Sequence, residues 1–181
     1  MTIVPPVLHD AELPLAERMA ARLDGELFPF GDGHSPIDEV DSPVLRLHAV
    51  LGARPRRLIA ELATAAWVWG ARDLPPIRHE FCVDLRARAR PKATPLATVR
   101  EVVLTTGDTV SLGGLRVMNP LRTAVDLARM RDDFAESDRD AVRRLAELAR
   151  FDVAACRDFM DRSRNLPAKR RALERLRECL E

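Results

Sequence analysis

The chain has 181 residues, of which 46% are hydrophobic and 31% are charged, and its net charge at pH 7 is +1. This composition is that of a globular protein with a sizeable core, and it excludes a disordered or collagen-like chain. A near-neutral total also excludes the strongly basic footprint of a dedicated nucleic-acid binder, and no apolar run is long enough to span a membrane.

The first part of the chain predicts helices separated by a loop. Apolar residues recur at four-residue steps over 15–23, which predicts one helix. Residues 26–43 are rich in Gly, Pro and Asp, so we expect a loop with room for one short strand. Ser42 and Pro43 are typical of the cap and first residue of a helix, and the basic and then apolar run at 54–71 predicts another, buried helix.

The middle of the chain predicts strands, and its last third predicts helices. Apolar and polar residues alternate over 77–86, a second strand is expected at 97–104, and 108–118 predicts two short strands that turn at a glycine pair. Beyond residue 119 the periodicity is helical. We expect helices at about 120–131, 137–149, 152–163 and 167–180.

This order of elements predicts an α+β fold, with a small, mostly antiparallel sheet between N-terminal helices and a C-terminal run of helices. Charge suggests where the chain divides. Residues 1–41 contain two basic and nine acidic side chains, whereas residues 42–130 contain 14 basic and seven acidic ones. We therefore expect an acidic N-terminal helix and loop over 1–41, followed by an α+β domain over 42–181.

The segment "GGLRVMNPLRTAVDLAR" at 113–129 predicts a joint between a strand and a helix. Asn119 can cap the helix with its side-chain oxygen, and Pro120 suits the first helical position because it needs no N–H partner. Arg122 and Asp126 are four residues apart, so we expect them to pair on the exposed side of the helix. A strand, cap and helix account for every residue here without any further function.

The same residues carry a family resemblance. "LRVMNPLRTAVDLAR" resembles the V-T-S-P-x-R-T-x-x-D-L-A segment of AbiEi-type antitoxin-like regulators of actinobacteria, with Asn119, Pro120, Arg122, Thr123 and Asp126 as its most specific part. "LIAELATAAWVWG" is similar to a helix of that family, "GELFPFGDG" to its wing, and the last helices to its C-terminal ones.

The resemblance implies a function and a partner. Proteins of this family are DNA-binding autorepressors paired with a nucleotidyltransferase-like toxin, and they usually carry an N-terminal winged helix-turn-helix. Here about 25 residues precede the wing-like segment, so the N-terminal region looks shortened, with residues 1–41 as a remnant of a winged helix. A helix-turn-helix needs two helices, and this region predicts one.

Basic side chains form two clusters that suit phosphate groups. Arg54, Arg56 and Arg57 stand at the expected start of a helix, where the helix dipole disfavours cations unless something else holds them. The second cluster follows a strand and comprises Arg86, Arg88, Arg90 and Lys92. Alternating residues of a strand lie about 7 Å apart, a spacing that suits successive phosphates of double-stranded DNA. A solvated loop and a charge-protected edge strand remain the alternatives.

Other candidates favour structural roles. Trp67 and Trp69 sit in an apolar run and are expected in the core. His79 and Cys82 would face opposite sides of a strand, so we expect no metal site. No nucleophile elbow, phosphate-binding loop or zinc-protease motif occurs, which predicts neither an enzyme nor a cofactor. Three irregularly spaced cysteines and the absence of a secretion signal favour a cytoplasmic protein without membrane attachment.

Two hypotheses follow from the sequence. The first is a non-catalytic transcriptional regulator or antitoxin-like protein that contacts DNA of its own promoter through the two basic clusters; it allows a homodimer. The alternative is a protein–protein interaction module that has the same fold and has lost DNA reading.

Overall fold

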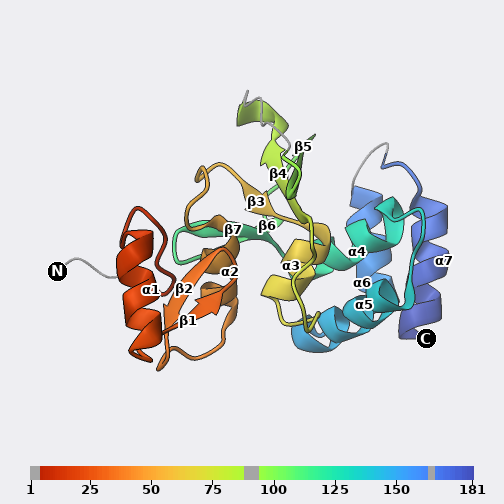
Figure 1. The fold of residues 1–181 in the computed structure, drawn as a ribbon. Coiled ribbons are helices and arrows are strands. Elements are labelled where there is room, and N and C mark those ends of the chain that lie inside the picture. Colours follow the sequence, from red (N-terminus) through yellow and green to blue (C-terminus); the bar gives the residue numbers. More distant parts are fainter. Residues whose placement is uncertain (1–4, 88–93, 163–165) are drawn as a thin grey trace.

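The computed structural model describes residues 5–87, 94–162 and 166–181 (Figure 1). A five-stranded sheet lies in the middle of the molecule. The first helix and a hairpin pack at one end, and the last helices form a bundle at the other (Figure 1). The N-terminal and C-terminal parts therefore lie on opposite sides of the sheet.

The N-terminal part comprises α1 (Leu15–Leu23), β1 (Leu27–Phe30), β2 (Gly33–Pro36) and α2 (Pro43–Leu51). β1 and β2 pair as an antiparallel hairpin, so the expected loop contains two strands where room for one was predicted. α2 begins as predicted. The side chain of Ser42 accepts a hydrogen bond from the backbone N–H of Leu45 at 3.2 Å, and Pro43 is the first helical residue.

The central sheet has the strand order β5-β4-β3-β7-β6. Its strands are β3 (Ile59–Ala60), β4 (His79–Asp84), β5 (Ala97–Val102), β6 (Thr109–Leu112) and β7 (Leu115–Met118). β3 is antiparallel to β4 and β6 to β7, whereas β3 is parallel to β7 and β4 to β5. The predicted α+β class is confirmed. The expectation of a mostly antiparallel sheet is wrong, because two of its four strand pairings, β3 with β7 and β4 with β5, are parallel. These two pairings join segments that are not neighbours in a hairpin, so no local turn in the sequence indicates them.

The prediction of one helix over 54–71 is wrong. Ile59 and Ala60 form β3, the central strand of the sheet, and helix α3 spans only Leu62–Val68. A continuous apolar run fits a buried strand as well as a buried helix, because both are covered on all sides. The arginines at 54–57 consequently lie in the loop between α2 and β3, and the helix-dipole argument for them does not apply.

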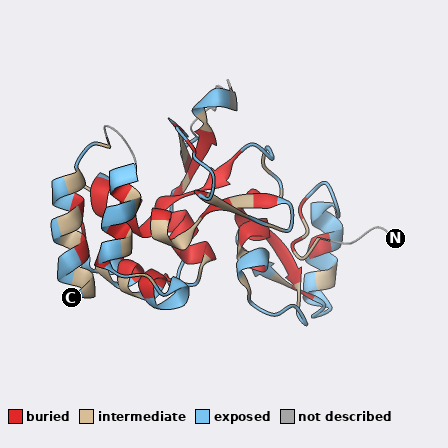
Figure 2. Cartoon of the chain, turned by 180° about the vertical axis from the view of Figure 1, so that it is seen from behind, coloured by how far each residue is buried: buried red, intermediate tan, exposed pale blue. Residues whose placement is uncertain are grey.

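The last part of the chain is helical, as predicted, with α4 (Pro120–Met130), α5 (Glu136–Ala149), α6 (Val153–Arg162) and α7 (Lys169–Leu180). These helices and α3 enclose a core that includes Leu127, Val142 and Leu176. A second core lies between the sheet and α2, where Trp67 is buried as expected. Figure 2 shows the buried residues running from one core to the other through the centre of the molecule. Trp69 packs against both cores, and its indole N–H donates to the Met118 carbonyl at 2.7 Å.

Candidate nucleic-acid interface

The β7–α4 junction, which we call the helix joint, contains Asn119, Pro120, Arg122, Thr123 and Asp126. Asn119 caps α4 as predicted, since its side-chain oxygen accepts the backbone N–H of Arg122 at 2.6 Å. The Thr123 hydroxyl donates to the Asn119 carbonyl at 2.8 Å. The backbone N–H of Asn119 donates to the Asp108 carbonyl at 2.9 Å, which ties the joint to the turn before β6.

The ion pair of the joint is buried, so its predicted exposed position is wrong. Arg122 donates to Asp126 at 2.7 Å and to Asp108 at 3.0 Å. Arg122 is 8% exposed and Asp126 only 1%. α4 contacts α3 and the other C-terminal helices, and Arg100 of β5 lies 3.5 Å from Asp126. The side of α4 that carries Arg122 and Asp126 is therefore covered by protein. A surface ion pair of this spacing would stabilise the helix by a few tenths of a kcal/mol. In a buried ion pair, the attraction between the two charges must first offset the hydration that both side chains lose.

The pair belongs to a larger network that joins the sheet to the helices. Arg100 of β5 donates to both oxygens of Glu61 at 2.7 and 2.6 Å and lies 3.5 Å from Asp126. Arg129 also donates to Asp126, and to the Pro167 carbonyl at 3.1 Å. Burial raises the pKa of the Glu61 carboxyl and lowers the pKa of Arg129. Every bond in this network is internal, so the joint is built to hold α4 against the sheet.

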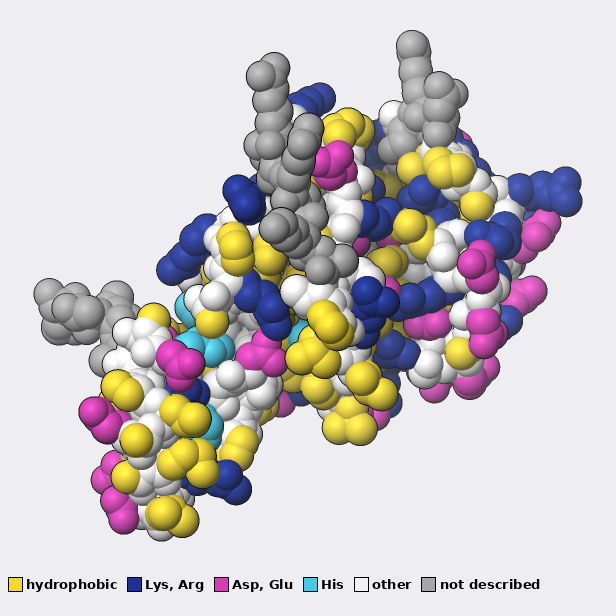
Figure 3. All heavy atoms as spheres, turned by 45° about the horizontal axis from the view of Figure 1, so that its top comes forward, with side chains coloured by type: hydrophobic (Ala, Val, Ile, Leu, Met, Phe, Trp, Pro, Cys, Tyr) yellow, Lys and Arg dark blue, Asp and Glu magenta, His cyan; other side chains and the backbone are white. Residues whose placement is uncertain are grey.

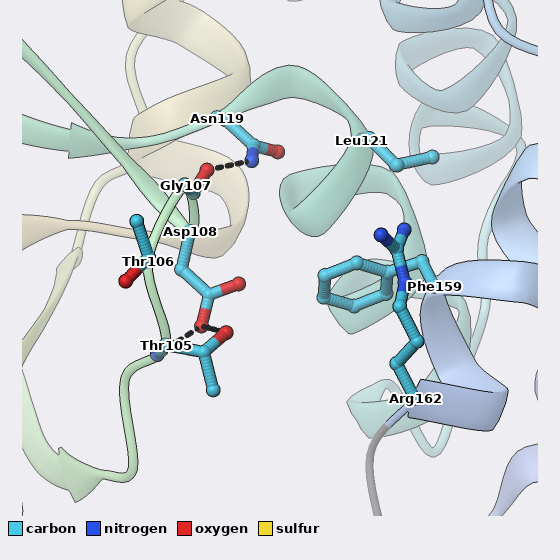
Figure 4. Close-up of a pocket in the computed structure, with 8 residues that line it drawn as sticks. All are labelled: Thr105, Thr106, Gly107, Asp108, Asn119, Leu121, Phe159 and Arg162. Atoms are coloured by element: carbon cyan, nitrogen blue, oxygen red, sulfur yellow. Dashed lines mark hydrogen bonds between the residues drawn. The ribbon is translucent and has the colours of Figure 1, made fainter.

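A cavity of about 500 Å³ lies beside the joint. Figure 4 shows the turn at 105–108 on one side and Phe159 and Arg162 of α6 on the other. The Asp108 carboxylate on its wall accepts the Thr105 N–H at 2.8 Å as well as Arg122. Among the described residues no group of three His, Cys, Asp or Glu is arranged to hold a metal ion. The Thr105 hydroxyl also donates to the Asp108 carboxylate at 3.0 Å, so the hydrogen bonds drawn on this wall in Figure 4 belong to the turn and the joint.

The exposed arginines predicted as phosphate contacts lie in two segments that flank the paired strands β3 and β4. Ile59 of β3 faces Cys82 of β4 in an antiparallel register, so the turn before β3 lies beside the end of β4. Arg56 and Arg57 occupy that turn, and Arg86 follows β4; all three are exposed. We call these three residues the basic sheet end. Arg86 lies in a short 3-10 helix, Leu85–Ala87, which begins directly after β4.

The neighbouring turn completes this end of the sheet. β3 runs parallel to β7, so the turn before β3 also lies beside the β6–β7 hairpin turn. One guanidinium nitrogen of Arg56 donates to the Gly114 carbonyl at 3.5 Å. Figure 3 shows Lys and Arg side chains over the upper part of the molecule, and on the right they are mixed with Asp and Glu side chains. Arg116, which sequence reasoning missed, faces Ile59 from β7 and adds a cation close to the same end.

The other residues predicted as phosphate contacts have different surroundings. Arg54 pairs with Asp32, donates to the Val50 carbonyl at 2.7 Å and stacks over the Phe81 ring at 5.3 Å. Its guanidinium is thus held within the protein. Arg88, Arg90 and Lys92 lie outside the described residues.

With the fold and this surface described, the chain can be compared with known proteins. A family model described as the AbiEi antitoxin C-terminal domain matches residues 58–181, more than half of the chain. The chain belongs to the AbiEi antitoxin family. A search among curated proteins found no match. The AbiEi match begins one residue before β3 and ends after α7, so it covers the sheet, the helix joint and all the C-terminal helices.

The family assigns an antitoxin role in a toxin–antitoxin system to this chain, and it confirms the resemblance found in the sequence. Arg86 lies inside the AbiEi match, whereas Arg56 and Arg57 stand immediately before it. No helix in the described part of the chain is long and apolar enough to cross a membrane.

Proposed function

We propose that this AbiEi-type antitoxin is a non-catalytic transcriptional regulator that binds double-stranded DNA of its own promoter through the basic sheet end. One observation carries the proposal: exposed arginines from two separate segments, Arg56 and Arg57 before β3 and Arg86 after β4, flank the ends of two paired strands. Their guanidinium groups are planar donors that suit phosphate oxygens.

The basic sheet end offers contacts to the DNA backbone and not a base-reading helix. Exposed guanidinium groups on the turn before β3 and after β4 can neutralise phosphates and so fix how the protein lies on the duplex. The proposal includes Arg88, Arg90 and Lys92 as further contacts, because they follow Arg86 directly in the chain. It leaves out Arg54, whose guanidinium is held by Asp32. The toxin partner in this proposal is a nucleotidyltransferase-like protein.

The test is a salt titration with a double variant, Arg56→Ala with Arg57→Ala. Fluorescence anisotropy with the upstream DNA, at about 50 and 200 mM salt, measures the slope of log K against log salt. Each lost phosphate contact lowers the size of that slope by about 0.9, so the double variant lowers it by about 1.8. Scrambled DNA of equal length separates sequence-dependent from general binding.

The matched control removes the same charge far from the sheet end. Arg170 and Arg177 are exposed on α7, and Arg170→Ala with Arg177→Ala should leave the slope unchanged. Equal losses in the two double variants would show that only total charge matters. No DNA binding by the unaltered protein at low salt would overturn the proposal.

A protein-interaction module is the second candidate, and a specific observation favours it: Leu15 and Leu23 of α1 are 58% and 86% exposed. Large exposed apolar groups on one side of a helix are typical of interaction surfaces. This candidate predicts that neither arginine double variant changes any DNA measurement.

A further inference from the structure

The cavity beside the helix joint is lined by groups that suit a small molecule. Its volume is about 500 Å³, within the range of about 300–1,000 Å³ that is typical of ligand pockets. Leu121 and Phe159 form the apolar part of its lining, and the polar side chains around them include Thr105, Thr106, Asp108 and Arg162. An apolar wall with a few polar groups is the usual composition of a small-molecule site.

One oxygen of Asp108 faces this cavity. Asp108 is 2% exposed, and its Oδ2 accepts the Thr105 N–H at 2.8 Å, the Thr105 hydroxyl at 3.0 Å and Arg122 at 3.0 Å. Within the described ranges no residue donates to Oδ1, and no fully enclosed side-chain oxygen lacks a partner there, so Oδ1 is not sealed in protein. Figure 4 shows this second oxygen directed toward α6. A buried carboxylate oxygen in that position is an acceptor for an N–H of a ligand.

Phe159 and Arg162 of α6 form the opposite side of the cavity and face the turn that carries Asp108 (Figure 4). The guanidinium carbon of Arg122 lies 5.7 Å from the centre of the Phe159 ring, and this contact holds the ring in place. Arg162 is exposed, and its Nε donates to the Asp158 carbonyl at 3.3 Å. The cavity therefore offers an aromatic ring in its lining and a positive charge at its edge.

The charges of the lining decide which chemical groups fit. Arg122 already pairs with Asp108, so the remaining carboxylate oxygen suits a neutral amino group better than a full positive charge. The Arg162 guanidinium suits a phosphate, whose oxygens match its planar set of donors. Phe159 suits a flat ring, which can stack on it. A ligand that satisfies all three groups has a flat ring with an amino group on its edge and a phosphate elsewhere.

We propose that this cavity binds a free nucleoside monophosphate whose base carries an exocyclic amino group. The base stacks on Phe159, its amino group donates to Oδ1 of Asp108, and its phosphate pairs with Arg162. Carboxylates accept hydrogen bonds from the amino group of cytosine, and aromatic side chains stack on bases of every kind. A strand of RNA carries the same groups, but a cavity of about 500 Å³ suits one small molecule.

This site is separate from the basic sheet end. The turn at 105–108 comes directly before β6, whereas the hairpin turn that Arg56 contacts through the Gly114 carbonyl comes directly after it. The two sites therefore lie at opposite ends of β6, and nucleotide binding in the cavity does not depend on the proposed DNA contacts.

A matched pair of nucleotides tests the contact with Asp108 without changing the protein. Cytidine monophosphate (CMP) and uridine monophosphate (UMP) have nearly the same size and charge, but CMP carries an amino group where UMP carries a carbonyl oxygen. An amide NMR titration of the full chain with each nucleotide up to about 5 mM detects dissociation constants into the millimolar range. CMP should shift the signals of the turn at 105–108 and of α6, and it should bind at least about fivefold more tightly than UMP.

Variants test the contacts on the opposite side of the cavity. Arg162→Gln removes an exposed charge, Phe159→Leu removes the flat ring but remains apolar, and each should weaken CMP binding at least about fivefold. Circular dichroism shows whether each variant is folded. Arg157→Gln is the matched control, because Arg157 is exposed on the same helix and is not part of the lining, so it should leave the affinity unchanged.

A phosphate can also bind at the basic sheet end, so the double variant Arg56→Ala with Arg57→Ala is titrated as well and should bind CMP as the unaltered protein does. The dinucleotide CpC should bind no more tightly than CMP, and tighter binding would assign the cavity to a strand of RNA and contradict the proposal. Absence of shifts around the cavity, equal affinity for CMP and UMP, or full affinity in a folded Arg162→Gln variant would also overturn it. None of these results depends on whether the protein binds DNA.

Discussion

Asp126→Asn should destabilise the protein by about 3 kcal/mol, because it removes the negative charge at the centre of the helix joint. Asp126 is 1% exposed and accepts hydrogen bonds from Arg122 and Arg129, with Arg100 at 3.5 Å. Asparagine has nearly the same shape and retains one acceptor oxygen. The substitution therefore changes charge with little change in packing.

The size of this effect follows from what remains beside each arginine. Arg100 keeps Glu61 and Arg122 keeps Asp108. Arg129, which is 7% exposed, keeps only the Pro167 carbonyl at 3.1 Å. Removing one partner of a buried ion pair typically costs about 3–5 kcal/mol, and the partly exposed Arg100 places this case at the lower end.

Urea denaturation followed by circular dichroism measures the change in the free energy of unfolding. Asp41→Asn is the matched control, since Asp41 pairs with Arg46 at 2.6 Å but its side chain is 55% exposed, and it should cost less than about 1 kcal/mol. Adding Arg129→Met to Asp126→Asn should restore part of the loss, because it removes the uncompensated charge. A loss below about 1 kcal/mol for Asp126→Asn would refute the reasoning.

Three further predictions concern other parts of the fold. Burial lowers the pKa of His48 and His79, so the unfolded chain binds more protons and the urea midpoint should fall as pH drops below about 6.5; a flat profile down to pH of about 5.5 would contradict this. Burial raises the pKa of Cys156 to about 12, so in the native protein iodoacetamide should modify the half-buried Cys179 first, as mass spectrometry of peptides can show; equal rates would argue against it. Gly113→Ala should lower the melting temperature, because Gly113 has φ of 56° and an added Cβ would stand 2.5 Å from a ring nitrogen of His48; an unchanged melting temperature would count against this geometry.

The helical half of the fold could be predicted because its signals are local. The cap and proline at the start of α4 and the 3.6-residue period that follows placed this helix at about 120–131, and it spans Pro120–Met130. β3 could not be predicted in this way. Its two residues become a central strand only through pairing with β4 and β7, and these partners are distant in sequence.

The site shows the same limit. Spacing alone paired Arg122 with Asp126, but nothing near them in sequence indicates that Arg100 and Glu61 come from the sheet to surround them. The network also depends on Asp108, which a turn brings to the same place. A local pattern can therefore identify a pair, while its burial and hence its energy depend on the packing of separate elements.

The segment from Arg56 to Glu61 connects the joint with the basic sheet end. Its first two residues are exposed arginines, its next residues enter the central strand, and Glu61 holds Arg100 of β5 within the network. Only four residues lie between Arg56, a proposed phosphate contact, and Glu61, whose carboxylate is buried. A change at Glu61 should therefore disturb the position of the arginine turn as well as the stability of the protein, whereas changes in the turn itself should affect the surface alone. The proposed interface therefore depends on the buried network, because the turn that carries Arg56 and Arg57 is held in place only if the strand that follows it is fixed.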